Sequence, residues 1–214
     1  MTVRRLAVLA LVYLGVMAGC SSQPGETEIY GRLSPLAAKP QLTERFQALL
    51  EAEAPQVVVN LPARDLDSIR FVKDVTSADG VDTWVTGNNR AIYMQRGVIT
   101  GSRGLGGDLA AADVSQILPL IYGLKGGTAE RVMSQYRGDD SVVPERFTCK
   151  VSNQGPWQGQ GADEIGPTIL MQEDCSNART GFRNFYWMSP DGRRMRQSRQ
   201  WVSDDLQYLP MRAL

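Results

Sequence analysis

The sequence predicts a mainly β fold with one or two short helices for residues 41–214, and three observations support this. Short runs of β-branched and aromatic residues recur at close spacing. Turn signatures such as Asp79-Gly80 and Gly87-Asn88-Asn89 separate several of these runs, as in antiparallel strands joined by tight turns. Apolar residues at helical spacing occupy only short stretches. We therefore expect a single antiparallel, mainly β domain.

The expected elements follow this pattern along the chain. Leu42, Phe46, Leu49 and Leu50 repeat at helical spacing until Pro55, which predicts a short amphipathic helix. Strands are expected at residues 57–59, 68–77, 81–86, 91–96, 131–137, 146–151, 168–173, 182–188 and 193–202. Their close spacing favours an antiparallel meander.

A glycine-rich loop at residues 100–109 leads into a stretch of helical character at residues 109–122. Its glycines do not have the dinucleotide-binding spacing, and no Gly-Lys-Ser/Thr follows, so a phosphate-binding loop is the weaker interpretation. The stronger interpretation is a tight strand-to-helix turn, in which Asp108 caps the helix.

The C-terminal hairpin is the clearest local structure in the sequence. Ser189-Pro190-Asp191-Gly192 is typical of a type I turn, with the glycine suited to a left-handed position. Counting from this turn, Phe185 and Trp187 share one face with Met195 and Gln197. We expect this face to belong to the core.

The same count puts Tyr186 on the opposite face with Arg194 and Arg196. This cationic face could hold an acidic polysaccharide, and the alternative is a face of solvated arginines. Trp157 lies in a loop rich in Gly, Gln and Pro at residues 152–166. It could stack on a sugar ring, or it could cover the end of the sheet.

Composition excludes several classes of function. Lys and Arg number 23 and Asp and Glu also number 23, so nothing favours a nucleic-acid partner. The chain has no histidine, which excludes Ser-His-Asp and Cys-His catalysis within it. We expect no metal and no cofactor, because the few cysteines lack the paired spacing of zinc sites.

The N-terminus has the three regions of a secretory signal. Arg4 and Arg5 are its charged part, residues 6–17 are apolar, and Ala18-Gly19 supply small residues before Cys20. The apolar run is too short for a transmembrane helix, which needs about 20 residues.

The run Val16-Met17-Ala18-Gly19-Cys20 resembles a bacterial lipobox, in which the cysteine is lipidated and becomes the new N-terminus. The alternative is an ordinary secretory signal with an accidental cysteine. We expect a signal peptide at 1–19 and a lipid-anchored tether at 20–40. Ser21 follows the cysteine, and lipoproteins without Asp there are sorted to the outer membrane of two-membrane bacteria.

Two cysteines remain after Cys20, namely Cys149 and Cys175. In an exported protein they occupy an oxidising compartment, which favours one disulfide over two separate buried thiols.

Carboxylates offer the remaining catalytic alternative. A glycan hydrolase would need two carboxyl groups roughly 5 to 10 Å apart across a glycosidic bond. The candidates are Asp108, Asp113, Glu164 and Glu173, which lie in unrelated segments. We therefore expect a protein that is not an enzyme.

Several motifs occur together along the chain: the lipobox, Trp84, Arg96-Gly97, Thr100, residues 104–109, Cys149, Glu173-Asp174-Cys175, Phe185-Tyr186-Trp187 and Ser198-Arg199-Gln200-Trp201. In this order they resemble the YjbF and GfcB lipoprotein family of group 4 capsule and other exopolysaccharide systems. The resemblance implies a curled, largely antiparallel or barrel-like sheet with helices, and brings no catalytic residues. It also implies an outer-membrane lipoprotein that assists polysaccharide assembly or export together with other export proteins.

Overall fold

The computed structural model describes residues 43–64, 66–136, 141–159 and 162–214. The predicted signal peptide, Cys20 and the tether lie outside these residues. The elements are α3 (Glu44–Glu51), β1 (Gln56–Leu61), the 3-10 turn η1 (Pro62–Arg64), β2 (Leu66–Thr76), β3 (Val81–Val85), β4 (Ala91–Gln95), β5 (Val98–Arg103), β6 (Leu109–Asp113), α4 (Leu118–Tyr122), β7 (Gly127–Tyr136), β8 (Val142–Pro156), α5 (Ala162–Ile165), β9 (Ile169–Ser176), β10 (Gly181–Met188), β11 (Met195–Ser203) and β12 (Gln207–Ala213).

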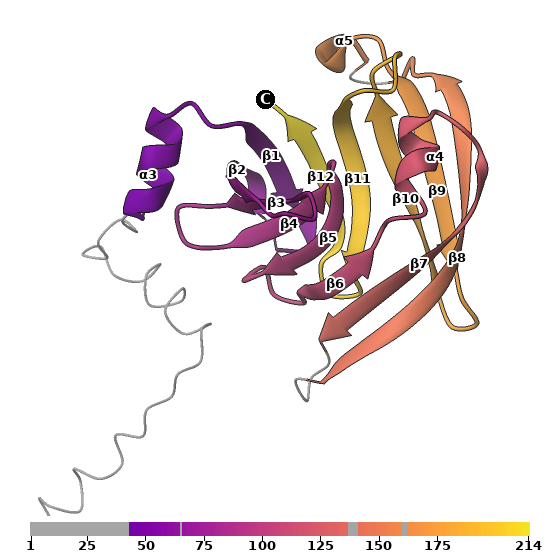
Figure 1. The fold of residues 1–214 in the computed structure, drawn as a ribbon, viewed down its shortest axis with the longest axis horizontal. Coiled ribbons are helices and arrows are strands. Elements are labelled where there is room, and N and C mark those ends of the chain that lie inside the picture. Colours follow the sequence, from indigo (N-terminus) through magenta and orange to yellow (C-terminus); the bar gives the residue numbers. More distant parts are fainter. Residues whose placement is uncertain (1–42, 65, 137–140, 160–161) are drawn as a thin grey trace, which may run out of the picture. The chain divides into compact units, whose positions relative to one another are not determined.

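All twelve strands belong to one antiparallel sheet, in the order β5-β4-β3-β2-β1-β12-β11-β10-β9-β8-β7-β6. The edge strands β5 and β6 are consecutive in the chain and lie close together (Figure 1). A Cβ atom at Gly101 of β5 would lie 3.4 Å from the Leu109 carbonyl oxygen of β6. The sheet therefore curls until it nearly closes, which confirms the predicted fold class.

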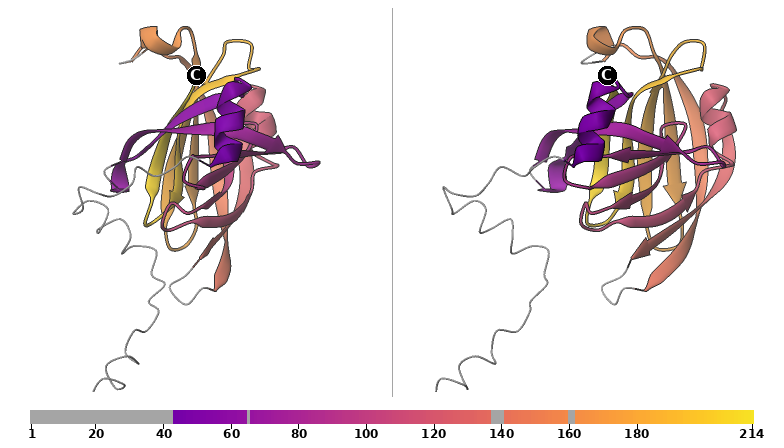
Figure 2. Two further views of the ribbon diagram at one scale, coloured as in Figure 1. Left: turned by 90° about the vertical axis from the view of Figure 1, so that its left-hand side faces the viewer. Right: turned by 60° about the vertical axis from the view of Figure 1, so that its left-hand side comes forward.

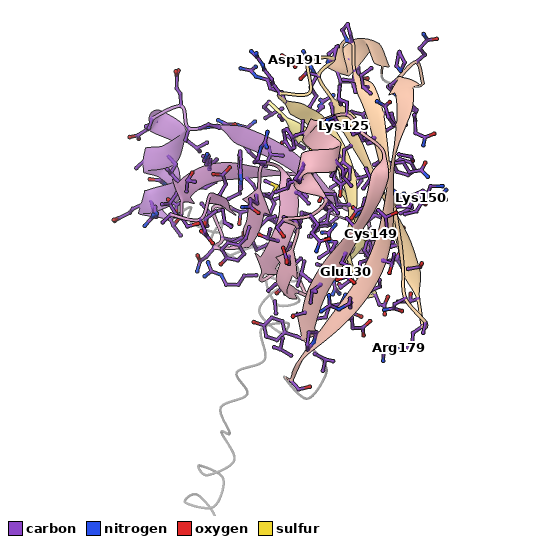
Figure 3. All side chains as sticks on the ribbon, turned by 45° about the vertical axis from the view of Figure 1, so that its right-hand side comes forward. Lys125, Glu130, Cys149, Lys150, Arg179 and Asp191 are labelled. Atoms are coloured by element: carbon purple, nitrogen blue, oxygen red, sulfur yellow. A yellow bond between two sulfur atoms is a disulfide. The ribbon has the colours of Figure 1, made fainter. Side chains whose placement is uncertain are left out.

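The inner face of this curl forms the core. Figure 2 shows β1–β5 curving across the strands of the C-terminal half. Along β1, Val57, Val59 and Leu61 are buried at every second position, as expected for a strand with one face in the core. On β8, Cys149 points into the curl whereas its neighbour Lys150 points outward (Figure 3).

The predicted N-terminal helix is confirmed as α3. The hydroxyl of Thr43 accepts a hydrogen bond from the backbone N–H of Phe46 at 3.3 Å and caps the first turn. Phe46 is buried, so the apolar stripe of this helix packs against the domain. None of the helices in the described part of the chain is long and apolar enough to cross a membrane.

The helix predicted at residues 109–122 is largely wrong. Residues Leu109–Asp113 form β6, which pairs with β7, and only α4 is helical. Alanine favours helices, but pairing with the edge of β7 outweighs this weak preference. Asp108 does not cap a helix: its carboxylate accepts the backbone N–H groups of Gly104 and Leu105 at 2.7 and 3.1 Å and fixes the glycine-rich loop.

Candidate functional site

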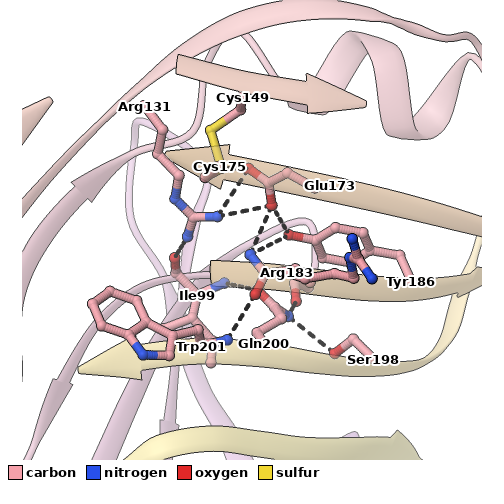
Figure 4. Close-up of polar contacts among 12 residues, drawn as sticks. Ile99, Arg131, Cys149, Glu173, Cys175, Arg183, Tyr186, Ser198, Gln200 and Trp201 are labelled. Carbon is pink, nitrogen blue, oxygen red and sulfur yellow. Dashed lines mark hydrogen bonds and ion pairs between the residues drawn. A yellow bond between two sulfur atoms is a disulfide. The ribbon is translucent and has the colours of Figure 1, made fainter. Parts of the chain in front are cut away.

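A fully buried ion pair lies inside the curl. Arg131 on β7 and Glu173 on β9 have no exposed side-chain surface, and Arg131 Nη1 lies 3.2 Å from Glu173 Oε2. The same carboxylate oxygen accepts hydrogen bonds from the Tyr186 hydroxyl at 2.6 Å and from Asn184 Nδ2 at 2.7 Å (Figure 4). These donors satisfy the buried carboxylate of Glu173, whereas Nε of Arg131 has no hydrogen-bond partner among the described residues.

Side chains of the same interior bond the backbone of β5. The N–H of Ile99 donates to Gln200 Oε1 at 2.9 Å, and its carbonyl accepts from Arg131 Nη2 at 3.2 Å (Figure 4). Gln200 Nε2 also donates to the Gly97 carbonyl at 2.8 Å. The interior network therefore ties β5 across the curl to β7 and β11. We call these residues, Ile99, Arg131, Glu173, Asn184, Tyr186 and Gln200, the interior network.

The exposed, cationic strand face predicted for Tyr186 is wrong. Tyr186 pairs with Ser198 on the inner face and is fully buried. Burial raises the pKa of its hydroxyl well above the usual range, and the adjacent Glu173 carboxylate raises it further. A register shift also places Met195 opposite Met188, so Met195 does not share the face of Trp187.

The predicted disulfide is present between Cys149 and Cys175, which pair directly across β8 and β9. Glu173 Oε1 lies 3.2 Å from Cys175 Sγ. These three residues are the one group of potential metal ligands within the described ranges. Their sulfurs are bonded to each other and Glu173 is paired with Arg131, so this group does not suit a metal ion.

A second region, at the mouth of the curl, is open. A cavity of about 350 Å³ lies between β3, β4, β11, β12 and α4. Its buried lining includes the apolar residues Val57, Met94 and Met211 together with Ser198. The exposed arginines Arg96, Arg194 and Arg196 also line it. We call this cavity the arginine cleft.

The turn between β4 and β5 holds Arg96 over the cleft. Arg96 and Gly97 both have positive φ, 50° and 84°, as in the type I′ turn of a two-residue hairpin. The guanidinium of Arg96 stacks on the Tyr122 ring, 3.6 Å from its centroid. The Tyr122 hydroxyl donates to the Arg96 carbonyl oxygen, and burial raises the pKa of this hydroxyl. The stacking holds the guanidinium beside the cavity, and the hydrogen bond holds the backbone of the turn.

The arginines of the cleft lack acidic partners. Surface ion pairs elsewhere join Arg183 to Asp174 and Arg193 to Asp191. In the part of the chain that the structure describes, no ion pair includes an arginine of the cleft. Among the lining residues, the carboxylate of Asp82 is engaged by Lys73 at 2.8 Å.

Of the four predicted contact residues, the structure brings two together. Arg194 and Arg196 both line the cleft. Arg196 lies at a β-bulge of β11, and its Nη1 donates to the Ile165 carbonyl oxygen of α5 at 3.1 Å. Trp157 is half-buried and packs against Trp187, with ring centroids 5.7 Å apart. It therefore covers the end of the sheet. Tyr186 lies in the interior network.

Trp84, Arg96 and Tyr122 also line the cleft, and their place in the site was not predicted from the sequence. One signal was available for Arg96: Arg-Gly between two strand-forming runs predicts a two-residue turn, which exposes its side chains. Tyr122 has no such local signal, because the helix it ends meets that turn only in the folded chain.

The candidate carboxylates of a hydrolase do not meet in the cleft, since none of them lines it. Asp113 accepts the backbone N–H of Ser115 at 2.9 Å. Glu164 is paired with Arg212 at 2.9 Å, and Glu173 is buried against Arg131. Each carboxylate thus has a local structural partner.

Comparisons with known proteins agree with this fold. The crystal structure of the hypothetical lipoprotein YmcC from Escherichia coli (K12) is similar, with a TM-score of 0.64 at 17% identity over 91% of this chain and 97% of that one. This likeness shows the fold alone. No curated protein matches the chain. Residues 36–214 match the family described as "Group 4 capsule polysaccharide lipoprotein gfcB, YjbF". The chain therefore belongs to the YjbF/GfcB family of group 4 capsule lipoproteins.

Proposed function

We propose that this protein is a non-catalytic accessory of capsule or exopolysaccharide assembly and export. The observation that supports this most strongly is the family match over residues 36–214. The arrangement of the described carboxylates is consistent with it, because the four candidates are engaged locally and apart from the cleft.

Its place would be the periplasmic face of the outer membrane, to which lipid on Cys20 tethers it. The lipobox and the serine after Cys20 support this location. Several acyl chains hold a protein far more firmly than one, because each buried methylene contributes about 0.8 kcal/mol. The tethered domain would then act beside polysaccharide export or assembly proteins.

A second candidate function is direct binding of polysaccharide. The arginine cleft favours it, because unpaired cations and aromatic rings meet there.

Deletion of the gene tests the accessory role. We expect less polymer at the cell surface while precursor synthesis continues, so surface and intracellular polymer must be measured separately. Normal surface polymer in the deletion strain would contradict the proposal.

Complementation then tests the anchor. Wild-type protein should restore surface polymer, whereas Cys20→Ala should accumulate as an unprocessed precursor. Ser21→Ala is the matched control and should be processed and sorted as the wild type is, because the residue after the cysteine is still not Asp. Mass spectrometry of the N-terminal peptide decides the point, and a peptide without lipid in the wild type would refute the anchor.

A further inference from the structure

We propose that the arginine cleft binds a carboxylate-bearing sugar unit of an acidic glycan. This inference rests on the proposed role in polysaccharide assembly or export and names the chemistry of the ligand. Its binding groups are the guanidiniums of Arg96 and Arg194. Arg196 also lines the cleft, but its Nη1 donates to the Ile165 carbonyl oxygen at 3.1 Å.

Charge is the first argument. Arg96 and Arg194 line one cavity without an acidic partner among the described residues, although other surface arginines have one. Like charges gathered around an apolar cavity repel each other, and an anion inside it relieves that repulsion. Guanidinium matches a carboxylate with two parallel hydrogen bonds, which favours this anion in particular.

The surface between the arginines is the second argument. Trp84, Met94 and Tyr122 line the same cavity, so an anion there also meets aromatic and apolar surface. Sugar rings offer apolar C–H faces together with polar substituents, and they suit such a wall. A volume of about 350 Å³ is in the range of small-ligand sites.

The strand pairing disfavours a peptide at this place. Peptides often bind by adding a strand to an exposed sheet edge. Here β11 lies between β10 and β12, and β12 lies between β11 and β1, so neither offers a free edge at the cleft.

The cleft is also organised before any ligand arrives. Arg96 is held on the Tyr122 ring at 3.6 Å. The backbone N–H of Arg194 donates to Ser189 Oγ at 2.9 Å, which ties it to the turn before β11. That turn packs on α4, since a Cβ at Gly192 would lie 2.5 Å from the Tyr122 carbonyl oxygen. Groups already in place lose less entropy on binding.

Calorimetry with the full lipidated protein in detergent micelles tests the inference. One probe is an oligosaccharide of alternating glucuronic acid and N-acetylglucosamine, and the second is the same oligosaccharide with its carboxyl groups reduced to alcohols. We expect the acidic probe to bind at least about tenfold more tightly than the reduced one. Binding of the acidic probe should weaken as salt is added.

Variants locate the binding. Arg96→Asn combined with Arg194→Gln should weaken binding of the acidic probe at least about tenfold, because both guanidiniums are removed. Asparagine is chosen at position 96 because it tolerates the left-handed backbone conformation of the turn. Arg193→Gln is the matched control and should bind as the wild type does, since Arg193 pairs with Asp191 and does not line the cleft. An unchanged urea midpoint shows that each variant is folded.

Three results would overturn the inference: no binding of the acidic probe, equal binding of the reduced probe, or equal binding by the double variant. Equally tight binding of an acetylated tripeptide with a free carboxylate would replace the sugar by a peptide and also overturn it. The accessory role stands or falls separately, on the polymer phenotype of the deletion strain.

Discussion

The interior network and the arginine cleft treat positive charge in opposite ways. In the network, Arg131 is fully buried and a single carboxylate, that of Glu173, neutralises it at 3.2 Å. In the cleft, Arg96, Arg194 and Arg196 are exposed, and no described carboxylate pairs with them. The two regions lie in the same curled sheet and share β11. This strand supplies Gln200 to the interior network and Met195 and Arg196 to the lining of the cleft.

The buried charge therefore has a structural role, whereas the exposed charges remain available to bind a ligand. A buried charge must be paired within the fold, because removing it from water costs several kcal/mol. An exposed cation at a cavity carries little such cost and can remain available to a ligand. Substitutions should therefore affect mainly stability in the network and mainly binding in the cleft.

The largest expected effect comes from breaking the buried pair. Glu173→Leu should lower the free energy of unfolding by about 3–5 kcal/mol, because Arg131 would remain charged and buried without its partner. Urea unfolding followed by circular dichroism measures this loss. A loss below about 1 kcal/mol would show that the network does not hold the fold as we describe.

The control removes both charges. Arg131→Met together with Glu173→Leu should recover much of the lost stability, since paired apolar residues often replace a buried ion pair at little cost. Equal losses in the single and double variants would mean that the Ile99 carbonyl, which also accepts from Arg131, matters as much as the charge.

Next in size is the disulfide. Cys149→Ala with Cys175→Ala should lower stability by about 3 kcal/mol, by releasing the unfolded chain from a cross-link that spans 26 residues. Non-reducing peptide mapping of the exported protein should first show the bond. Free thiols at both positions would contradict this, as would equal stability of the wild type with and without reductant.

Local pattern was enough to predict most of the fold. The strand at 182–188 and the turn at Ser189-Pro190-Asp191-Gly192 are present, and Gly192 has a φ of 69°. These features depend on neighbours in the sequence. By contrast, β6 is a strand because β7 lies beside it, although the sequence predicted a helix there. Strand β12, the last along the chain, was also missed, and so was β5, part of which was predicted to be a glycine-rich loop.

The candidate site depends more on long-range packing. Tyr186 was placed on one face with Arg194 and Arg196 by a count from the turn, and the count could not tell the inner face from the outer one. Arg194 and Arg196 were identified as candidate contacts, but their partners in the cleft, Arg96 and Tyr122, come from distant segments. Two-residue periodicity specifies that a strand has two faces, and the curl of the sheet decides which one is buried.

A smaller effect should come from Tyr186→Phe. At neutral pH we expect a loss of about 1.5–3 kcal/mol, because a buried donor to the Glu173 carboxylate is removed. The pKa of Tyr186 is raised in the folded protein, so wild-type stability is fully present below about pH 10, the usual tyrosine pKa, and falls as pH rises above it. Phenylalanine cannot ionise, so the variant should lose less stability above pH 10, and the two curves should approach each other. Parallel curves in urea unfolding across this pH range would contradict the buried hydroxyl.

The smallest effect on stability is expected in the cleft, and it sharpens the comparison most. Arg194→Gln should change the free energy of unfolding by no more than about 0.5 kcal/mol, because Arg194 is exposed and pairs with no described carboxylate. Loss of one of several clustered positive charges could even stabilise the domain slightly, by relieving repulsion. Adding salt should reduce any such gain, since salt screens repulsion between exposed charges. A loss above about 1 kcal/mol would mean that Arg194 supports the fold, and the cleft would then resemble the interior network rather than a site kept open for an anion.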